Sequence, residues 1–421
     1  MVDMRWQRPP FDIVRAAHAE LLVSDLEASR RFYVDLLGFV VTAEEPGALY
    51  LRGYEEQVHH SLVLRQLPAA GGPAAGGGPG PARRPEAQAP DGGRHGPISP
   101  GGRGEPGAGL TSAPGQVLPG TTQGHVLPAA PPGRGLPDAA EGQVLPAVAP
   151  GQALPAAAHL AYRVAGEDDL DRLAAFFQER GCRFTWLEPG DEPGQGRALR
   201  VQDPLGFPVE FFCRMERAER LLQRFDRYRG AHILRLDHFN LHVPDVQAAY
   251  DHYKALGFRC SEYTATDPPG PDERLWAAWM YRKPNVHDVA LMNGDGPRLH
   301  HLGFWVSDTQ SVLRACDILA AAGWADAIER GPGRHGLSNA FFVYLRDPDG
   351  HRIELYTCDY YTGDPDFEPI RWSVNDPRRG TFWGHAAPAS WFEESSRVLD
   401  LDGRPVPVEP AKLRERPQTV T

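Results

Sequence analysis

The segment RAAHAELLVSDLEASRRFYVDLLGF, residues 15–39, is matched by RLDHFNLHVPDVQAAYDHYKALGF, residues 235–258. Each segment reads as a strand with alternating residues, a polar turn that contains an aspartate (Asp25 or Asp245), and an amphipathic helix. A Leu-Gly-Phe sequence follows, and its glycine is placed to end the helix. The match indicates that one supersecondary unit occurs at least twice in the chain.

A second pair of matching segments follows each of these. HLAYRV at 159–164 matches HLGFWV at 301–306, and DPLGFPVEFF at 203–212 matches DPDGHRIELY at 347–356. The chain therefore contains four strand–helix–strands units, taken two by two into domains. Mixed helices and strands in this order predict an α+β fold.

The expected domain boundaries follow from these repeats and from one segment of unusual composition. Residues 69–156 are mostly Gly, Pro and Ala, without an aromatic residue, and carry a G-x-x-L-P motif five times. Such a segment cannot bury enough apolar surface to offset its ordering entropy, so we expect a disordered insertion rather than a β-solenoid. The divisions are a first domain of 10–68 with 157–215, this insertion, a second domain of 230–358, and a C-terminal lid and tail of 359–421.

Composition excludes several classes of function. The 421 residues carry a formal net charge of −11, which gives no electrostatic support for binding nucleic acid or an anionic membrane. Five cysteines without a CxxC spacing favour free thiols in a reducing cytoplasm over disulfides or a zinc framework. No apolar run is long enough to suggest a membrane span or a signal peptide.

Three polar residues on predicted strands of the second domain suggest a metal site. His238, His301 and Glu354 come from three separate strands, and two histidines with one carboxylate form a facial triad that leaves three octahedral positions for ligands. A structural zinc would need four ligands, usually with cysteine. Taken singly, each histidine is more often a hydrogen-bonded core residue. Glu354 is a ligand only if its face of the strand lines a cavity instead of meeting water.

The segments RLDHFN, AAWMYRKPNVHD, GPRLHHLGF and IERGPGRHGLSNAFFVYLRDPDGHRIELYTCDYYTGDPD resemble the extradiol ring-cleavage dioxygenases of the vicinal oxygen chelate superfamily. The resemblance implies two such domains, each of two paired βαβββ modules, with the second domain catalytic. It also implies one Fe(II) or Mn(II) per chain, held by His238, His301 and Glu354. In that family a catechol chelates the metal through both oxygens, O2 takes the third position, and the ring opens beside the hydroxyls.

The same resemblance assigns proton-transfer residues. His287, in NVHDVAL, matches the family's base on the O2 side, although from the residues alone a solvent-facing strand position is preferred. His335 and Tyr344, in GRHGLSNAFFVY, match the pair that contacts the bound catechol oxygen. The chemistry requires such groups, because a proton must leave the catechol and another must reach the departing oxygen.

The chain resembles members of the family that act on 3,4-dihydroxyphenylacetate. This resemblance implies that the chain cleaves the ring of that compound, in aromatic degradation, and that the product is 5-carboxymethyl-2-hydroxymuconate semialdehyde. A carboxylate in the substrate needs a cationic partner, for which arginine is suited. The implied substrate-binding residues are Asn240, Trp279, Arg330, Arg378, Arg379 and Trp391. The adjacent pair of arginines would otherwise be solvated. Another catechol, with the same reaction, is the alternative substrate.

The first domain keeps His18, His159 and Glu210 at matching positions, but the partners of His335 and Tyr344 are missing there. The resemblance implies that this domain is structural and metal-free. A second metal ion held by these three residues is the alternative, which metal analysis would decide. Two other classes of function remain: a non-catalytic ligand-binding protein on the same fold, or a tether formed by the insertion. The resemblance further implies a homotetramer, with a small catechol and O2 as partners.

Overall fold

The computed structural model describes residues 8–67 and 154–413. The insertion predicted at 69–156 lies outside these residues except at its end, where Ala156 begins a strand and pairs with Leu22. Within the described ranges, no helix is long and apolar enough to cross a membrane.

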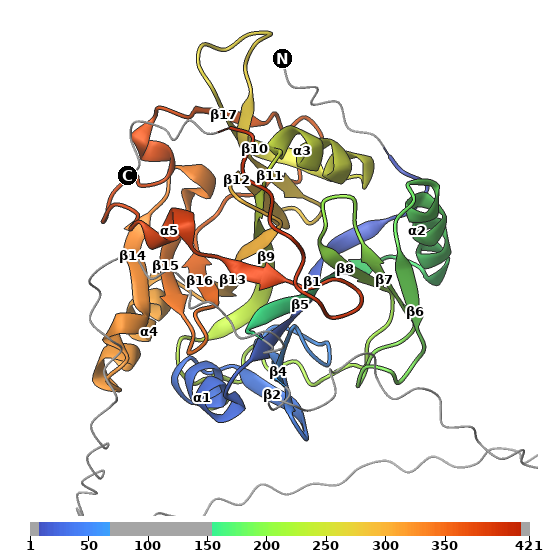
Figure 1. The fold of residues 1–421 in the computed structure, drawn as a ribbon. Coiled ribbons are helices and arrows are strands. Elements are labelled where there is room, and N and C mark those ends of the chain that lie inside the picture. The colour runs from blue at the N-terminus through green and yellow to red at the C-terminus, as the bar shows by residue number, and fades with distance from the viewer. Residues whose placement is uncertain (1–7, 68–153, 414–421) are drawn as a thin grey trace, which may run out of the picture. The chain divides into compact units, whose positions relative to one another are not determined.

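The two halves of the chain repeat one βαβββ module, as the sequence predicts (Figure 1). In the first half, module 1 is β1 (Ile13–Val23), α1 (Leu26–Arg30) continued by the π-helix η1 (Arg31–Leu36), β2 (Val40–Glu45), β3 (Ala48–Arg52) and β4 (Leu62–Gln66). Module 2 is β5 (Ala156–Val164), α2 (Glu167–Glu179), β6 (Phe184–Leu187), β7 (Ala198–Gln202) and β8 (Pro208–Phe212).

The second half continues in the same order. Module 3 is β9 (Ile233–Val243), α3 (Val246–Ala255), β10 (Arg259–Ala265), β11 (Leu275–Tyr281) and β12 (Val289–Asn293). Module 4 is β13 (Arg298–Val306), α4 (Thr309–Ala321), β14 (Ile328–Arg334), β15 (Phe341–Arg346) and β16 (Arg352–Thr357). The remaining elements are β17 (Ile370–Ser373), α5 (Ser390–Glu393), β18 (Ser396–Val398), and the short helices η2 (Phe225–Arg227), η3 (Ala325–Ala327), η4 (Leu337–Asn339) and η5 (Pro377–Arg379).

Local sequence explains where the module helices begin and end. The Asp25 side chain accepts hydrogen bonds from two backbone N–H groups of α1, and Asp245 accepts one from the first turn of α3. Both are the N-caps expected from the turn sequence. Gly38 and Gly257 have φ values of +85° and +87°, which only glycine adopts without strain, and each lies just after its helix.

Pairs of modules join through their first strands. In the second half, β9 pairs with β12 in parallel and with β13 antiparallel, and β13 pairs with β16 in parallel. The first half has the same pairings of β1 with β4 and β5, and of β5 with β8. β18 pairs with both β13 and β5, so the C-terminal tail connects the two halves. The predicted fold class is confirmed, whereas the residue numbers of the domain boundaries remain predictions.

Alternation along the strands separates the core from a polar inner face. Ile353 and Leu355 of β16 are fully buried in the main apolar core, together with side chains of α4. The helix α4 packs against β16 (Figure 1). Burying each of these side chains contributes roughly 1.5–3 kcal/mol. Glu354, between them, points to the opposite face of the sheet and is also buried. A buried carboxylate on that face requires partners, and its surroundings define the site.

Candidate active site with a metal-binding triad

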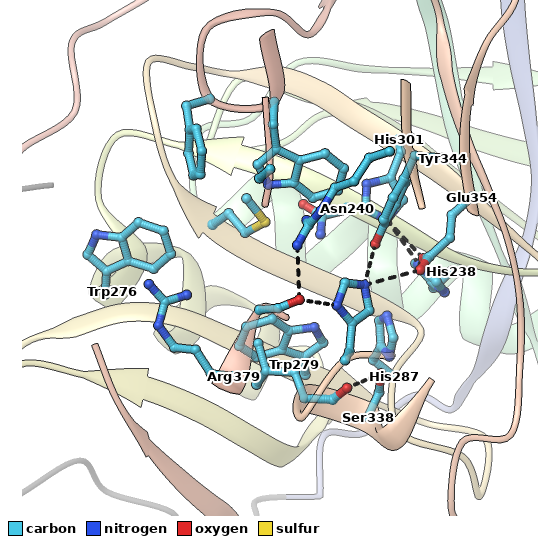
Figure 2. Close-up of a pocket in the computed structure, with 18 residues that line it drawn as sticks. His238, Asn240, Trp276, Trp279, His287, His301, Ser338, Tyr344, Glu354 and Arg379 are labelled. Atoms are coloured by element: carbon cyan, nitrogen blue, oxygen red, sulfur yellow. Dashed lines mark hydrogen bonds and ion pairs between the residues drawn. The ribbon is translucent and has the colours of Figure 1, made fainter. Parts of the chain in front are cut away.

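His238, His301 and Glu354 lie on the neighbouring strands β9, β13 and β16, and their side chains converge (Figure 2). The two Nε2 atoms are 3.2 Å apart, and Glu354 Oε2 lies 3.1 Å from Nε2 of His238 and 3.3 Å from that of His301. Ligands about 2.1 Å from a metal at right angles are about 3 Å apart, so this triangle fits one face of an octahedral ion.

The strand register creates this convergence. Gly303 of β13 pairs with His238 on one side and with Glu354 on the other. A Cβ atom at position 303 would lie 2.1 Å from the His238 ring, so the glycine makes room for the imidazole. Gly303, two residues after His301 in HLGFWV, is therefore part of the site's construction.

Neighbouring groups fix which ring nitrogens face the centre. His238 Nδ1 lies 3.3 Å from the carboxylate of Asp237, and His301 Nδ1 lies 2.7 Å from Nδ1 of His300. His300 Nε2 in turn donates to the backbone oxygen of Trp391 at 2.9 Å, which leaves His300 Nδ1 to accept from His301. Both predicted ligands thus present Nε2 to the centre, an arrangement typical of metal-bound histidines.

The charge states suit a cation at the centre. Burial lowers the pKa of His301 to about 4, so its imidazole is neutral and offers a lone pair. Burial alone would raise the pKa of Glu354, but hydrogen bonds with the surrounding histidines hold it well below its ordinary value. Burial alone would lower the pKa of His238, but its hydrogen bonds with Asp237 and Glu354 raise it, so a metal ion would take the place of a proton there. The triad thus supplies one carboxylate and two imidazoles, a set used for non-haem iron and manganese.

The pocket beside the triad contains most of the residues predicted for catalysis and substrate binding. They are Asn240, Trp279, His287, Arg330, His335, Tyr344, Arg379 and Trp391. In the view of Figure 2, Arg379 and Trp276 lie at one side of the pocket and Glu354 with His238 at the other. Arg378 is absent from this lining.

His335 and Tyr344 form a hydrogen-bonded pair at the triad. His335 Nδ1 contacts the carbonyl of Gly380, which can only accept, so Nδ1 carries the proton and Nε2 is an acceptor. Tyr344 Oη donates to that Nε2 at 2.9 Å, and His335 Nε2 is 3.7 Å from Glu354. Burial lowers the pKa of His335 and raises the pKa of Tyr344 well above its ordinary range. A neutral base and a neutral phenol therefore face the pocket.

His287 is not solvent-facing, contrary to the reading from its local sequence alone. It is buried, and its ring centroid lies 3.9 Å from that of His238. Its Nδ1 has no hydrogen-bond partner among the described residues. Burial, with the proximity of His238, keeps the pKa of His287 well below its ordinary value. A neutral imidazole thus lines the pocket on the side of His238.

Two of the three predicted arginines reach the pocket. Arg330 is buried, donates to the backbone oxygen of Gly380 at 2.9 Å and to the Thr381 hydroxyl at 2.8 Å, and has its Cζ 4.6 Å from the ring centroid of Trp391. In the described chain, neither Arg330 nor Arg379 forms an ion pair with a carboxylate. The pocket therefore has two buried or half-buried positive charges without a counter-ion from the protein.

The prediction of a pocket position for Arg378 is corrected by the structure. Its guanidinium is exposed and binds the carboxylate of Asp376 at 2.8–3.0 Å. The turn of η5 sends adjacent side chains in different directions, so only Arg379 points inward.

Several residues of the site were not predicted. Asp237 and His300, which orient the ligands, each directly precede a predicted ligand in the sequence, in DH and HH, and this adjacency was an available signal. Tyr356, whose hydroxyl donates to Asp237, and the lining residues Trp276 and Phe392 had no such signal. Aromatic residues in strands or tails usually pack in the core. Only the folded structure shows which of them contact the site instead.

Comparisons with known proteins agree with this geometry. The model of the Glyoxalase/Bleomycin resistance protein/Dioxygenase superfamily matches residues 15–211 and 235–355, and the chain belongs to this superfamily. A manganese-dependent 2,3-dihydroxybiphenyl 1,2-dioxygenase of Geobacillus genomosp. 3 is 34% identical over 239 residues, which are 53% of this chain and 74% of that protein.

Two solved structures resemble nearly the whole chain. Homoprotocatechuate 2,3-dioxygenase from Arthrobacter globiformis is 39% identical, with a TM-score of 0.73 and coverage of 96% of this chain and 98% of that one. The Brevibacterium fuscum enzyme in complex with 3,4-dihydroxyphenylacetate is 37% identical, with a TM-score of 0.73 and coverage of 97% and 100%. With the triad, these similarities place the chain among the metal-dependent extradiol ring-cleaving dioxygenases of the superfamily.

Proposed function

We propose that the chain cleaves 3,4-dihydroxyphenylacetate to 5-carboxymethyl-2-hydroxymuconate semialdehyde. The reaction breaks the ring bond beside the two hydroxyls and places both atoms of O2 in the product. The observation that carries the proposal is a triad of metal ligands at one side of a pocket that also holds two arginines without a protein counter-ion. A substrate with a catechol at one end and a carboxylate at the other matches both features.

In this proposal His238, His301 and Glu354 hold one Fe(II) or Mn(II), which the ligand set accommodates equally. Such an ion would supply a Lewis acid that lowers the pKa of the catechol and a place where catechol and O2 come together. The protein supplies orientation, because Asp237 and His300 hold the two imidazoles with Nε2 directed at the centre. Both atoms would thus be positioned before substrate arrives.

Proton transfer falls to groups whose protonation states are set by the fold. His335 Nε2 is an acceptor because its Nδ1 proton is engaged by Gly380, so it can take the catechol proton. Tyr344, now bonded to that nitrogen, would instead donate to the bound catechol oxygen. His287 lies beside the His238 ring and would serve as the base and acid on the O2 side.

The carboxylate of the substrate would be recognised by Arg330 and Arg379. Arg330 uses one terminal nitrogen for Gly380 and Thr381, while its buried Nε has no partner among the described residues. A carboxylate would supply that partner and balance the charge. Asn240, Trp279 and Trp391 complete the pocket, with Trp391 packed edge-on against Tyr344 at 4.2 Å between ring centroids.

Anaerobic loading of the metal-free chain with Fe(II) or Mn(II), followed by 3,4-dihydroxyphenylacetate and O2, tests the proposal. The yellow ring-opened product should form with either metal or both, and one O2 should be consumed per product. The similarity to a 2,3-dihydroxybiphenyl dioxygenase favours an uncharged catechol as the second candidate substrate. A higher kcat/KM for 2,3-dihydroxybiphenyl than for the arylacetate would replace the proposed substrate by that one.

Subunit assembly is inferred only by resemblance, and the location only from the cysteine pattern. A homotetramer and a cytoplasmic location remain predictions, and sedimentation velocity of the metal-loaded chain measures the first directly.

A further inference from the structure

The first half of the chain contains a second buried cluster of two histidines and a glutamate. His18 Nε2 lies 3.1 Å from His159 Nε2 and 3.3 Å from Glu210 Oε1, and all three side chains are almost fully buried. These two distances match those of the second triad, and all three ligand atoms lie within 4.8 Å of one another. Distance alone would therefore allow this cluster to hold an ion.

The two clusters occupy the same place in their sheets. Ala161 pairs with His18 across β1 and β5 and with Glu210 across β5 and β8. In the second half, Gly303 likewise pairs with His238 across β9 and β13 and with Glu354 across β13 and β16. Because the backbone frames correspond residue by residue, any difference between the clusters must come from side chains.

Arginine replaces tyrosine at one decisive position. Arg200 pairs with Glu210 across β7 and β8, where Tyr344 pairs with Glu354 across β15 and β16. The Arg200 guanidinium donates to Glu210 Oε2 from Nε at 2.9 Å and from a terminal nitrogen at 2.5 Å. The Gln195 amide donates to Oε1 at 2.8 Å. Both oxygens of this carboxylate thus have donors from the protein.

The guanidinium also sets the charge of the cluster. Burial alone would raise the pKa of Glu210, but Arg200 and the histidines hold it well below its ordinary value. Burial and the charge of Arg200 keep the pKa of His159 well below its own ordinary value. The ionised carboxylate is therefore already neutralised by a cation within hydrogen-bond distance, and a divalent ion would have to compete with it.

The supports of a metal-bound histidine are also missing. Ala17 and Ala158 precede the two histidines, where Asp237 and His300 precede the ligands of the second triad. Accordingly, Nδ1 of His18 and Nδ1 of His159 have no hydrogen-bond partner among the described residues. Loss of such a partner typically weakens metal binding 10- to 100-fold.

We propose that Arg200 takes the place of the metal in the first half of the chain, so that His18, His159 and Glu210 form a closed, ion-paired core and the chain binds one metal ion. The inference goes beyond the proposed activity, because it concerns the half of the chain that does not hold the catalytic triad. The triad of the second half serves only for comparison, and the test measures the amount of bound metal instead of ring cleavage.

The test removes the second triad and then the guanidinium. Glu354→Ala should bind almost no Mn(II) after equilibration and desalting, whereas Glu354→Ala with Arg200→Met should regain a bound ion near one equivalent in excess Mn(II). Arg197→Met is the matched control, since Arg197 lies on the same domain and pairs with Asp171 at the surface. This control should add no metal to Glu354→Ala. A folded Arg200→Met double variant that still binds none would overturn the inference.

Two further measurements keep the result interpretable. Mn(II) should raise the Tm of the Arg200→Met double variant but leave that of Glu354→Ala unchanged, because only an ion bound to the folded state stabilises it. If methionine prevents folding, Arg200→Tyr reproduces the residue found opposite Glu354 and should open the cluster in the same way. In the otherwise unmodified chain, two equivalents of Mn(II), or one that is lost in Glu210→Ala, would also overturn the inference.

Discussion

Replacing Arg379 with methionine should remove the preference for an anionic catechol and leave the ring-cleaving centre intact. Arg379 lines the pocket, its Nε donates to the Val374 carbonyl at 3.1 Å, and its Cζ lies 5.1 Å from the ring centroid of Trp276. Burial first, and then repulsion from Arg330, lower the pKa of Arg379 to about 10. The side chain is thus still a cation at neutral pH and gains from any carboxylate that enters.

The magnitude follows from that unbalanced charge. A hydrogen bond between ionised groups in a partly dehydrated site contributes about 1.5–3 kcal/mol net. Since each 1.4 kcal/mol is a factor of ten, kcat/KM for 3,4-dihydroxyphenylacetate should fall roughly 10- to 150-fold. An uncharged catechol forms no such hydrogen bond with Arg379. Its binding free energy therefore does not become less favourable when the repulsion between the two arginines is removed. Its kcat/KM should change less than about threefold.

The assay compares initial rates of product absorbance for 3,4-dihydroxyphenylacetate and 4-methylcatechol in the same metal-loaded preparations. Arg378→Met is the matched control, because Arg378 is the adjacent residue but is exposed and paired with Asp376. The control should keep the ratio of the two kcat/KM values within about twofold of the unmodified enzyme. Equal losses for both substrates in Arg379→Met, or the same change of ratio in Arg378→Met, would refute the assignment of Arg379 to the carboxylate.

Three other outcomes are expected. Glu354→Ala should lower bound Mn(II) to less than about a tenth of an equivalent by elemental analysis, because it removes one of three ligands and the only anionic one. Tyr344→Phe should keep the metal but lower kcat about 100-fold in the product assay, since it loses the hydroxyl bonded to His335 at 2.9 Å. Residues 67–155 can be replaced by Gly-Asp-Gly-Pro, the segment that joins β12 to β13. This change should leave kcat within about twofold, because the entropic cost of bringing the ends of a shorter link together is smaller.

Much of the fold was predictable because the chain repeats its own pattern. The segments at 15–39 and 235–258 carry the same caps, alternation and terminal glycine, so local physics specifies the same strand and helix twice. Exact ends were less accessible: Ala156 reads as part of the Ala-rich insertion, yet pairing with Leu22 makes it a strand residue. Strand ends depend on a partner that lies far away in sequence.

The candidate site was predictable in part. His238, His301 and Glu354 could be proposed as one set because they lie on three separate predicted strands and match the ligand positions of the family. Their roles still await the experiments above. Arg378 shows the limit of this reasoning, since adjacent arginines are indistinguishable in sequence and a single turn decides which one faces the pocket.

The sequence by itself determined the modules, their pairing and the residue types available for metal binding, because helix caps, alternation and repeats act over a few neighbouring residues. The tertiary structure showed how the two similar histidine–glutamate clusters differ in their hydrogen bonds, which is the basis for proposing that only one of them binds a metal. Tyr344 lies opposite Glu354, and Arg200 lies opposite Glu210, on the adjacent antiparallel strand. Such pairing exists only once the strands are in register.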